Sequence, residues 1–521
     1  MSHVFTSNPS FEFPNDNNPI FERLGIGVKR DFQRRLPFYK SDIVDGINAQ
    51  SLATTLFLFF ACLAPAIGFG GILGLATQGS MGAIEMVTST AFCVVVYALC
   101  SAQPIQLIGP MGPNLAFTIS LAQLATTLSL PFLPLYAWTG LWTATFLMIS
   151  ALTSASNVVQ YLTRFTDEIF SILISAIFLF GAITDVTKTF MRPESDASKA
   201  LLTLICASVT FGSAILLKGL KNSIYFTKAI RNNLSNFAPA IGVALGSLVA
   251  RGVRIRYQCS VGALPVLNLP TKFATTTGRP WLIPLLDLPV WARWGAILPA
   301  LLATVLLFLD QNITARLVNN PRYHMVKGRN KGDALDGMHG DMFVLSLLTG
   351  LTSLVGLPWM AGATTRSAAH VRSLLLFDDN GAIRGTLENR VSGAAIHALI
   401  GACVFLPWPR MLLSQVPLPV LSGVFMYLGF TSLQGLELWD RMKEVFQDAS
   451  VAPAMRWSVV PQTTNRIVTA VQVICVGIMM RLTKSQFGVI SPLVIALLPV
   501  LRVALIKSGL VSKHSMDVLD A

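Results

Sequence analysis

The stretch GLPWMAGATTRSAAHVRSL, residues Gly356–Leu374, interrupts a long apolar part of the chain. The apolar run before Arg366 carries no charge, which predicts a membrane crossing followed by a break. Pro358 and the turn that contains Gly362 prevent one continuous helix, and a new helix can begin near Thr364. A helix that begins inside a membrane directs unpaired N–H groups and a partial positive charge into the protein. Arg366 would lie in its first turn and add a full positive charge.

The preceding apolar helix ends in FLDQNITARLV, residues Phe308–Val318. Asp310 and Thr314 are four residues apart and therefore share one face of that helix. Their oxygen atoms suit a hard cation such as sodium. The alternative is that Asp310 is an interfacial acid and that Arg366 snorkels at a helix end. Because ionisable groups inside membrane spans are costly and usually functional, we favour an anion cradle beside a cation-binding carboxylate.

The composition is that of a polytopic membrane protein. The 521 residues are 53% hydrophobic and only 12% charged, and their mean hydropathy is +0.60. Two uncharged runs, Gly46–Ile84 and Met86–Thr163, are longer than the ~20 residues that one span needs. The net charge of +13 then indicates basic cytoplasmic loops rather than affinity for nucleic acid.

Several classes of protein do not fit. Most of the seven cysteines lie in apolar runs, which indicates packing rather than disulfides or metal ligands. No phosphate-binding glycine loop with its lysine is present, so we do not expect an ATP-driven pump. No cleavable signal peptide is visible. No nucleophile–base pair or metal set suggests an enzyme, and we expect no cofactor, with sodium considered only as a co-substrate.

Hydropathy divides the chain into two sets of seven spans. We predict a cytoplasmic tail over 1–45, a first repeat over 46–250, an extracellular loop over 251–293, a second repeat over 294–508 and a cytoplasmic tail over 509–521. The first set of spans falls roughly at 50–76, 83–101, 105–125, 135–156, 167–187, 200–218 and 236–250. The second falls at 294–317, 341–357, 362–376, 391–407, 417–434, 467–482 and 487–506. An odd number of spans in each repeat gives the two repeats opposite orientations in the membrane.

The third span of each set is interrupted. In Ala102–Leu121, AQPIQLIGPMGPNLAFTISL, Pro104, Pro110 and Pro113 prevent a regular helix until about Asn114. This mirrors the break before Thr364. Interrupted segments at matching places in two halves predict a transporter site near the middle of the bilayer.

Positive residues place both termini on the cytoplasmic side of the predicted topology, and we expect a multi-pass protein of the plasma membrane. The loop over 251–293 is the exception, because it carries six cations although the count of spans puts it outside.

Long motifs in the chain resemble those of the bicarbonate transporter (anion exchanger) family, which includes borate transporters. The resemblance covers roughly residues 20–506 and rests on PVWARWGAILPALLATVLLFLDQNITARLVNNP, HGDMFVLSLLTGLTSLVGLPWMAGATTRSAAHVRSL, TRFTDEIFSILISAIFLF, FGGILGLATQGSMGAIEMVTSTA and PLPVLSGVFMYLGFTSLQGLELWDRM. It implies an all-α seven-plus-seven inverted repeat, with a core domain (spans 1–4 and 8–11) that moves against a gate domain (spans 5–7 and 12–14). It also implies a homodimer formed through the gate domains, and we expect a short form without the large N-terminal cytoplasmic domain of animal members.

The resemblance also carries over individual residues. Asp310 matches the acidic residue of the family's eighth span, and the flanking DQNIT with Thr314 resembles the sodium-coupled branch. Arg366 matches the arginine of the exchangers, so the sequence mixes two branches. Glu85 also matches a family acid, but its place at the start of the second span favours a helix-start charge over a ligand.

We therefore predict a secondary active transporter of bicarbonate or carbonate that works by elevator or rocking alternating access, with sodium coupling favoured. The alternatives are a chloride/bicarbonate exchanger and a borate exporter. A membrane scaffold that has lost transport would be a different class, but the site residues are all in place. The predicted substrate-binding residues are Gly112, Pro113, Asn114, Phe117, Asp310, Thr314, Thr364, Thr365 and Arg366, with Asp310 and Thr314 also as the candidate sodium ligands.

Overall fold

A computed structural model describes the chain except residues 1–22, 162–163, 192–196, 228–229, 232–233, 236, 258–263, 268, 271, 330–337, 378–382, 435, 445–455, 484, 486–490 and 521. About half of the predicted N-terminal tail and parts of the predicted 251–293 loop therefore lie outside the described residues.

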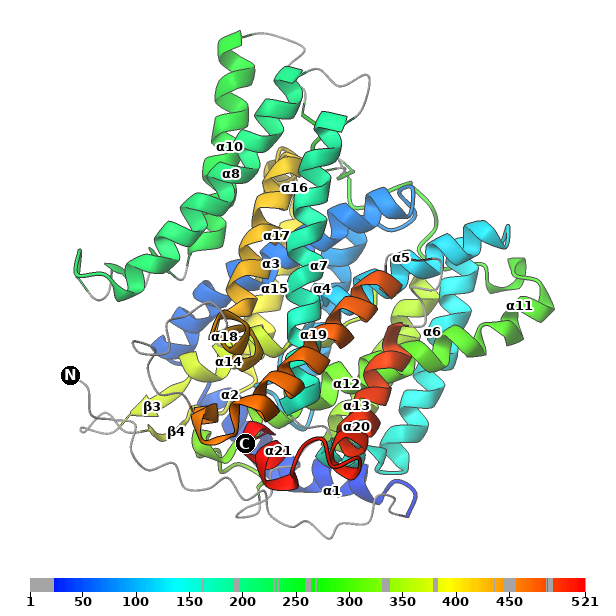
Figure 1. Cartoon of the computed structure of the whole chain (residues 1–521). Coiled ribbons are helices and arrows are strands. Elements are labelled where there is room, and N and C mark those ends of the chain that lie inside the picture. Colours follow the sequence, from blue (N-terminus) through cyan, green and yellow to red (C-terminus); the bar gives the residue numbers. More distant parts are fainter. Residues whose placement is uncertain are drawn as a thin grey trace.

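Among the residues that the structure describes, fourteen helices follow the order of the predicted spans in two sets of seven, which confirms an all-α polytopic membrane fold. Figure 1 shows their arrangement. The first set is α3 (Ala49–Ala76), α4 (Ala83–Cys100), α5 (Gly112–Thr127), α6 (Phe132–Leu152), α7 (Arg164–Met191), α8 (Ala197–Gly219) and α10 (Ala238–Tyr257). The second set is α12 (Ile297–Val318), α13 (Met338–Val355), α14 (Thr364–Ser373), α15 (Val391–Phe405), α17 (Leu418–Leu433), α19 (Gln462–Thr483) and α20 (Ser491–Lys507).

Shorter elements join these helices. They are α1 (Ile26–Arg35), α2 (Tyr39–Val44), α11 (Val290–Gly295), α16 (Pro407–Leu413), α18 (Glu437–Glu444), α21 (Lys513–Asp520) and the strands β1 (Ile108–Gly109), β2 (Ala361–Gly362), β3 (Leu375–Phe377) and β4 (Ile383–Thr386). Figure 1 places α1 and α21, the first and last described helices, at the same end of the bundle. In the described part of the chain, nine helices are long and apolar enough to cross a membrane, or ten if α15 and α16, bent by 84°, form one span.

The two interrupted segments differ slightly from the prediction. Helix α5 begins at Gly112 rather than near Asn114, because Pro113 is tolerated in a first turn, where its missing N–H has no intrahelical partner to lose. Helix α14 has only ten residues and ends at Ser373, where the chain turns into the β3–β4 hairpin. Both are therefore half-helices rather than full spans.

The helices pack in two groups that match the expected core and gate domains. In the core, α13 lies along α6, α15 lies against α4 and α3, and α12 packs on α6. In the gate, α17 lies between α7 and α8, α10 packs on α8, and α19 packs on α7. Helices α5 and α14 lie in the core, where α3 and α12 contact both of them.

Local capping explains where the core helices begin. Asn48 caps α3 by accepting a hydrogen bond from the backbone N–H of Ser51 at 2.8 Å. At the start of α4 the Glu85 carboxylate accepts from Gly82 N–H at 2.8 Å and from Thr276 N–H at 2.7 Å. This confirms the prediction that Glu85 is a helix-start charge.

Candidate functional site

The two interrupted segments meet inside the core domain. Strand β1 of the first repeat pairs antiparallel with β2 of the second, with Ile108 opposite Gly362 and Gly109 opposite Ala361. Each strand leads directly into a half-helix, α5 or α14, so the N-termini of both half-helices are held close to one short pair of strands. A pair of helix N-termini of this kind attracts anions.

Helix α12 lies directly behind this pair. A Cβ added at Gly362 would lie 2.6 Å from the carbonyl oxygen of Asp310 and 2.8 Å from the Thr314 side chain. Only glycine therefore allows β2 to pack so closely on α12. The Thr314 and Thr364 hydroxyls are 2.9 Å apart, which joins the C-terminal part of α12 to the first residue of α14.

One face of α14 satisfies the extended backbone that precedes α5. Ser367 Oγ donates to the Leu107 carbonyl and accepts from the Leu107 N–H, each at 3.0 Å. His370 Nδ1 lies 2.7 Å from the Ile105 carbonyl. Buried backbone groups must find such partners, and here the second repeat supplies them to the first.

Arg366 continues this face toward the start of α5. Its Nη2 donates to the Pro110 carbonyl at 2.5 Å, while its buried Nη1 has no hydrogen-bond partner among the described residues. A Cβ on Gly109 would lie 2.7 Å from Nη1, so the guanidinium rests against the bare backbone of β1. The bond to Pro110 thus holds the guanidinium in place, while the Nη1 group stays unsatisfied within the described part of the chain.

Asp310 lies in the middle of α12 and is only 1% exposed. Neither oxygen of its carboxyl group has a hydrogen-bond partner in the described part of the chain, and no ion pair joins it to Arg366 there. An ionised carboxylate buried without a partner is strongly unfavourable. A proton or a bound cation would therefore stabilise Asp310.

The remaining predicted residues spread around the starts of the half-helices. Gly112 and Pro113 are buried in the first turn of α5, and Asn114, also buried, has an amide nitrogen without a partner among the described residues. Phe117 is buried one turn further on, with its ring centroid 6.1 Å from that of Trp359. Thr365 is exposed, whereas the other predicted substrate-binding residues are buried or half-buried.

Sequence reasoning missed two glutamines. Gln106, in the extended segment, donates from Nε2 to the Gln311 carbonyl at 3.2 Å, and Gln311 Nε2 donates to the Tyr97 hydroxyl at 2.7 Å. The Oε1 atoms of both glutamines are buried and lack partners within the described residues. Buried amides in apolar segments are the signal that could have found them.

Metal ligands of the ordinary kind are not gathered here. Across the described residues, no group of three or more His, Cys, Asp or Glu side chains could hold a metal ion. The assignment of Asp310 and Thr314 as sodium ligands stays a prediction. Sodium can be bound by oxygen atoms of carboxylate, hydroxyl and carbonyl groups, so it does not need a group of three such side chains.

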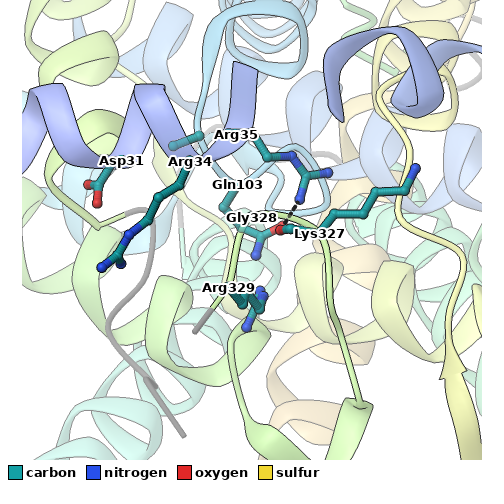
Figure 2. Close-up of a pocket in the computed structure, with 8 residues that line it drawn as sticks. Asp31, Arg34, Arg35, Gln103, Lys327, Gly328 and Arg329 are labelled. Atoms are coloured by element: carbon teal, nitrogen blue, oxygen red, sulfur yellow. Dashed lines mark hydrogen bonds between the residues drawn. The ribbon is translucent and has the colours of Figure 1, made fainter. Parts of the chain in front are cut away.

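A separate small pocket, with a cavity volume of about 10 Å³, lies where α1 meets the core domain (Figure 2). It is lined by Asp31, Arg34, Arg35, Ala102, Gln103, Lys327, Gly328 and Arg329. Arg35 binds the carboxylates of Asp42 and Glu388 at 2.6 and 2.7 Å and donates to the Lys327 carbonyl. These ion pairs fasten α1 and α2 to the core, so we assign the cluster a structural role.

Comparison with known proteins gives the same picture of the fold. A family model described as "HCO3- transporter integral membrane domain" matches residues 23–198 and 192–521. The transmembrane domain of the cyanobacterial bicarbonate transporter BicA superposes with a TM-score of 0.56 at 14% identity, covering 84% of this chain and 99% of that one. The murine solute carrier 26 family member A9 gives a TM-score of 0.57 at 12% identity, covering 92% and 72% of the two chains.

Two curated relatives are similar in sequence. The band 3 anion transport protein of Rattus norvegicus is 32% identical over 94% of this chain and 55% of that relative. The sodium-driven chloride bicarbonate exchanger of Mus musculus is 32% identical over 97% of this chain and 50% of that relative. The chain thus spans about half the length of the curated relatives it matches.

Proposed function

The chain belongs to the bicarbonate transporter family, a family of membrane transporters, and on that premise we propose that it is a secondary active transporter of bicarbonate or carbonate rather than an enzyme. The observation that carries the proposal is the meeting of two half-helix N-termini at the β1–β2 pair, with the free Nη1 of Arg366 beside them. Such an arrangement binds an oxyanion without covalent chemistry.

Each group has a separate part in this proposal. Backbone N–H groups at the starts of α5 and α14 donate to the anion's oxygens, and Arg366 adds a full charge while its bond to Pro110 keeps the guanidinium in place. The core domain carries the bound anion, and its movement against the gate domain exposes the site to each side in turn.

We further propose that sodium accompanies the anion. Asp310 is buried without a partner, and Thr314 lies one turn away on the same helix. Because Arg366 would repel a cation in an empty site, sodium and the anion should each raise the affinity for the other. The rivals are a proton on Asp310, with chloride exchange, and export of borate on the same scaffold.

The decisive experiment measures intravesicular pH in proteoliposomes that contain the purified chain. Bicarbonate-dependent pH change that stops when choline replaces sodium would support sodium-coupled transport. Full activity without sodium but none without chloride would indicate exchange. No bicarbonate-dependent change, together with boron efflux from loaded vesicles, would replace the proposal with borate export.

Assembly and location complete the proposal. We expect a homodimer formed through the gate domains, in the plasma membrane, with both termini in the cytoplasm. Crosslinking of the protein in native membranes, and protease access from each side, test these points separately from transport.

A further inference from the structure

A phenylalanine of the gate domain lies directly on the start of the core half-helix α5. A Cβ added at Gly112 would lie 2.9 Å from both Cε1 and Cζ of Phe178, and 3.5 Å from Cγ2 of Ile174. Phe178 and Ile174 are one turn apart on α7, so one face of this gate helix covers the N-terminus of α5.

Two further rings hold Phe178 in position. Its centroid lies 5.4 Å from that of Phe69 on α3 and 5.8 Å from that of Phe425 on α17, and those two rings stack at 5.3 Å. Phe69 and Phe425 are each only 3% exposed. A Cβ at Gly68 would lie 2.8 Å from Phe425, so the Phe425 ring packs directly on the backbone of α3 and has no space to move toward it.

We infer that Phe178 forms the gate-side wall of the anion site and sets the largest anion that the site admits. This inference rests on the proposed function. An anion at the start of α5 would meet N–H groups on the core side and the Phe178 ring on the gate side. Because neighbouring rings fix Phe178, the ring acts as a size limit, and an apolar wall of this kind discriminates by the volume that it excludes.

The size limit can be tested with anions of equal charge. Uptake into proteoliposomes that contain the purified protein is measured for nitrate, which is planar like bicarbonate, and for methanesulfonate, which is bulkier and remains ionised. Phe178→Leu removes three carbon atoms and should raise the methanesulfonate-to-nitrate flux ratio by at least ~10-fold, because one methylene in an apolar pocket is already worth roughly 10–200-fold. Phe178→Trp should lower the ratio.

The matched control is Phe180→Leu on the same helix. Phe180 is 51% exposed and lies two residues further along, on the other side of α7. Its substitution should leave the flux ratio at the wild-type value. A ratio that is unchanged in both Phe178 variants, or that rises equally in Phe180→Leu, would overturn the inference.

A rescue experiment tests the contact itself. Gly112→Ala places a methyl group against the Phe178 ring and should lower nitrate flux, whereas the double variant Gly112→Ala/Phe178→Leu should recover most of it. Independent losses that simply add would contradict a direct contact. If the wild-type protein carries nitrate but not bicarbonate, the proposed function fails while the size limit stands. If wild type carries bicarbonate and the ratios do not move, only the inference fails.

Discussion

The half-helices α5 and α14 occupy equivalent places in the two repeats, yet they differ in chemistry. Helix α5 begins with Gly112 and Pro113 and has no charged residue in its sixteen. Helix α14 has ten residues and presents Arg366, Ser367 and His370 to the extended segment that precedes α5. The fold is thus symmetric, but the side chains of α14 bind the backbone of the extended segment that precedes α5, whereas α5 has no charged side chain to offer in return.

Removing the charge tests this difference most severely. Arg366→Ala should abolish bicarbonate flux while expression stays near the wild-type level. The loss of one partner from a desolvated charged site costs ~2–5 kcal/mol, which corresponds to roughly 30-fold to several-thousand-fold in affinity. Arg366→Lys keeps the charge but not the planar fork of donors, so it should recover only part of the flux. Unchanged flux in Arg366→Ala would mean that the arginine merely snorkels.

The strand pair offers a second test, because its two glycines contact different kinds of atom. Gly362→Ala would drive a methyl group into the backbone of α12 at Asp310, and should lower the stability by about 3 kcal/mol. Gly109→Ala would meet only the end of the flexible Arg366 side chain, so the protein should fold normally while flux falls. Thermal unfolding in detergent and anion flux, measured on both variants, separate the two effects. Equal losses of stability would show that β1 and β2 are packed alike.

Part of this arrangement could be predicted from sequence. Pro104, Pro110 and Pro358 predict the two interruptions. Helix α14 begins at Thr364, where the sequence predicts that a new helix can begin. Hydropathy also identifies the nine described helices that are long and apolar enough to cross a membrane, because apolar length is a local property of the chain.

The contacts between the repeats could not be predicted in the same way. The pairing of Ile108 with Gly362, and the Arg366 guanidinium resting on Gly109, join segments about 250 residues apart in the sequence. Local patterns carry no information on such register. The same holds for the contact between Gln106 and Gln311: their place in apolar segments singles them out, but only the packing of α12 beside the extended segment brings them together.

The smallest expected effect compares one buried hydroxyl from each half-helix. Ser367 Oγ is the acceptor for the Leu107 N–H, whereas Thr118 Oγ on α5 donates at 2.8 Å to the Asn114 carbonyl of its own helix. Ser367→Ala leaves a buried N–H without a partner, which costs about 1–3 kcal/mol. Thr118→Val removes a bond that the helix does not need, and should cost less than about 1 kcal/mol. Thermal unfolding of the two variants in the same detergent measures the difference. A larger shift for Thr118→Val would mean that the first repeat holds its own half-helix, and that α14 is not what positions the segment before α5.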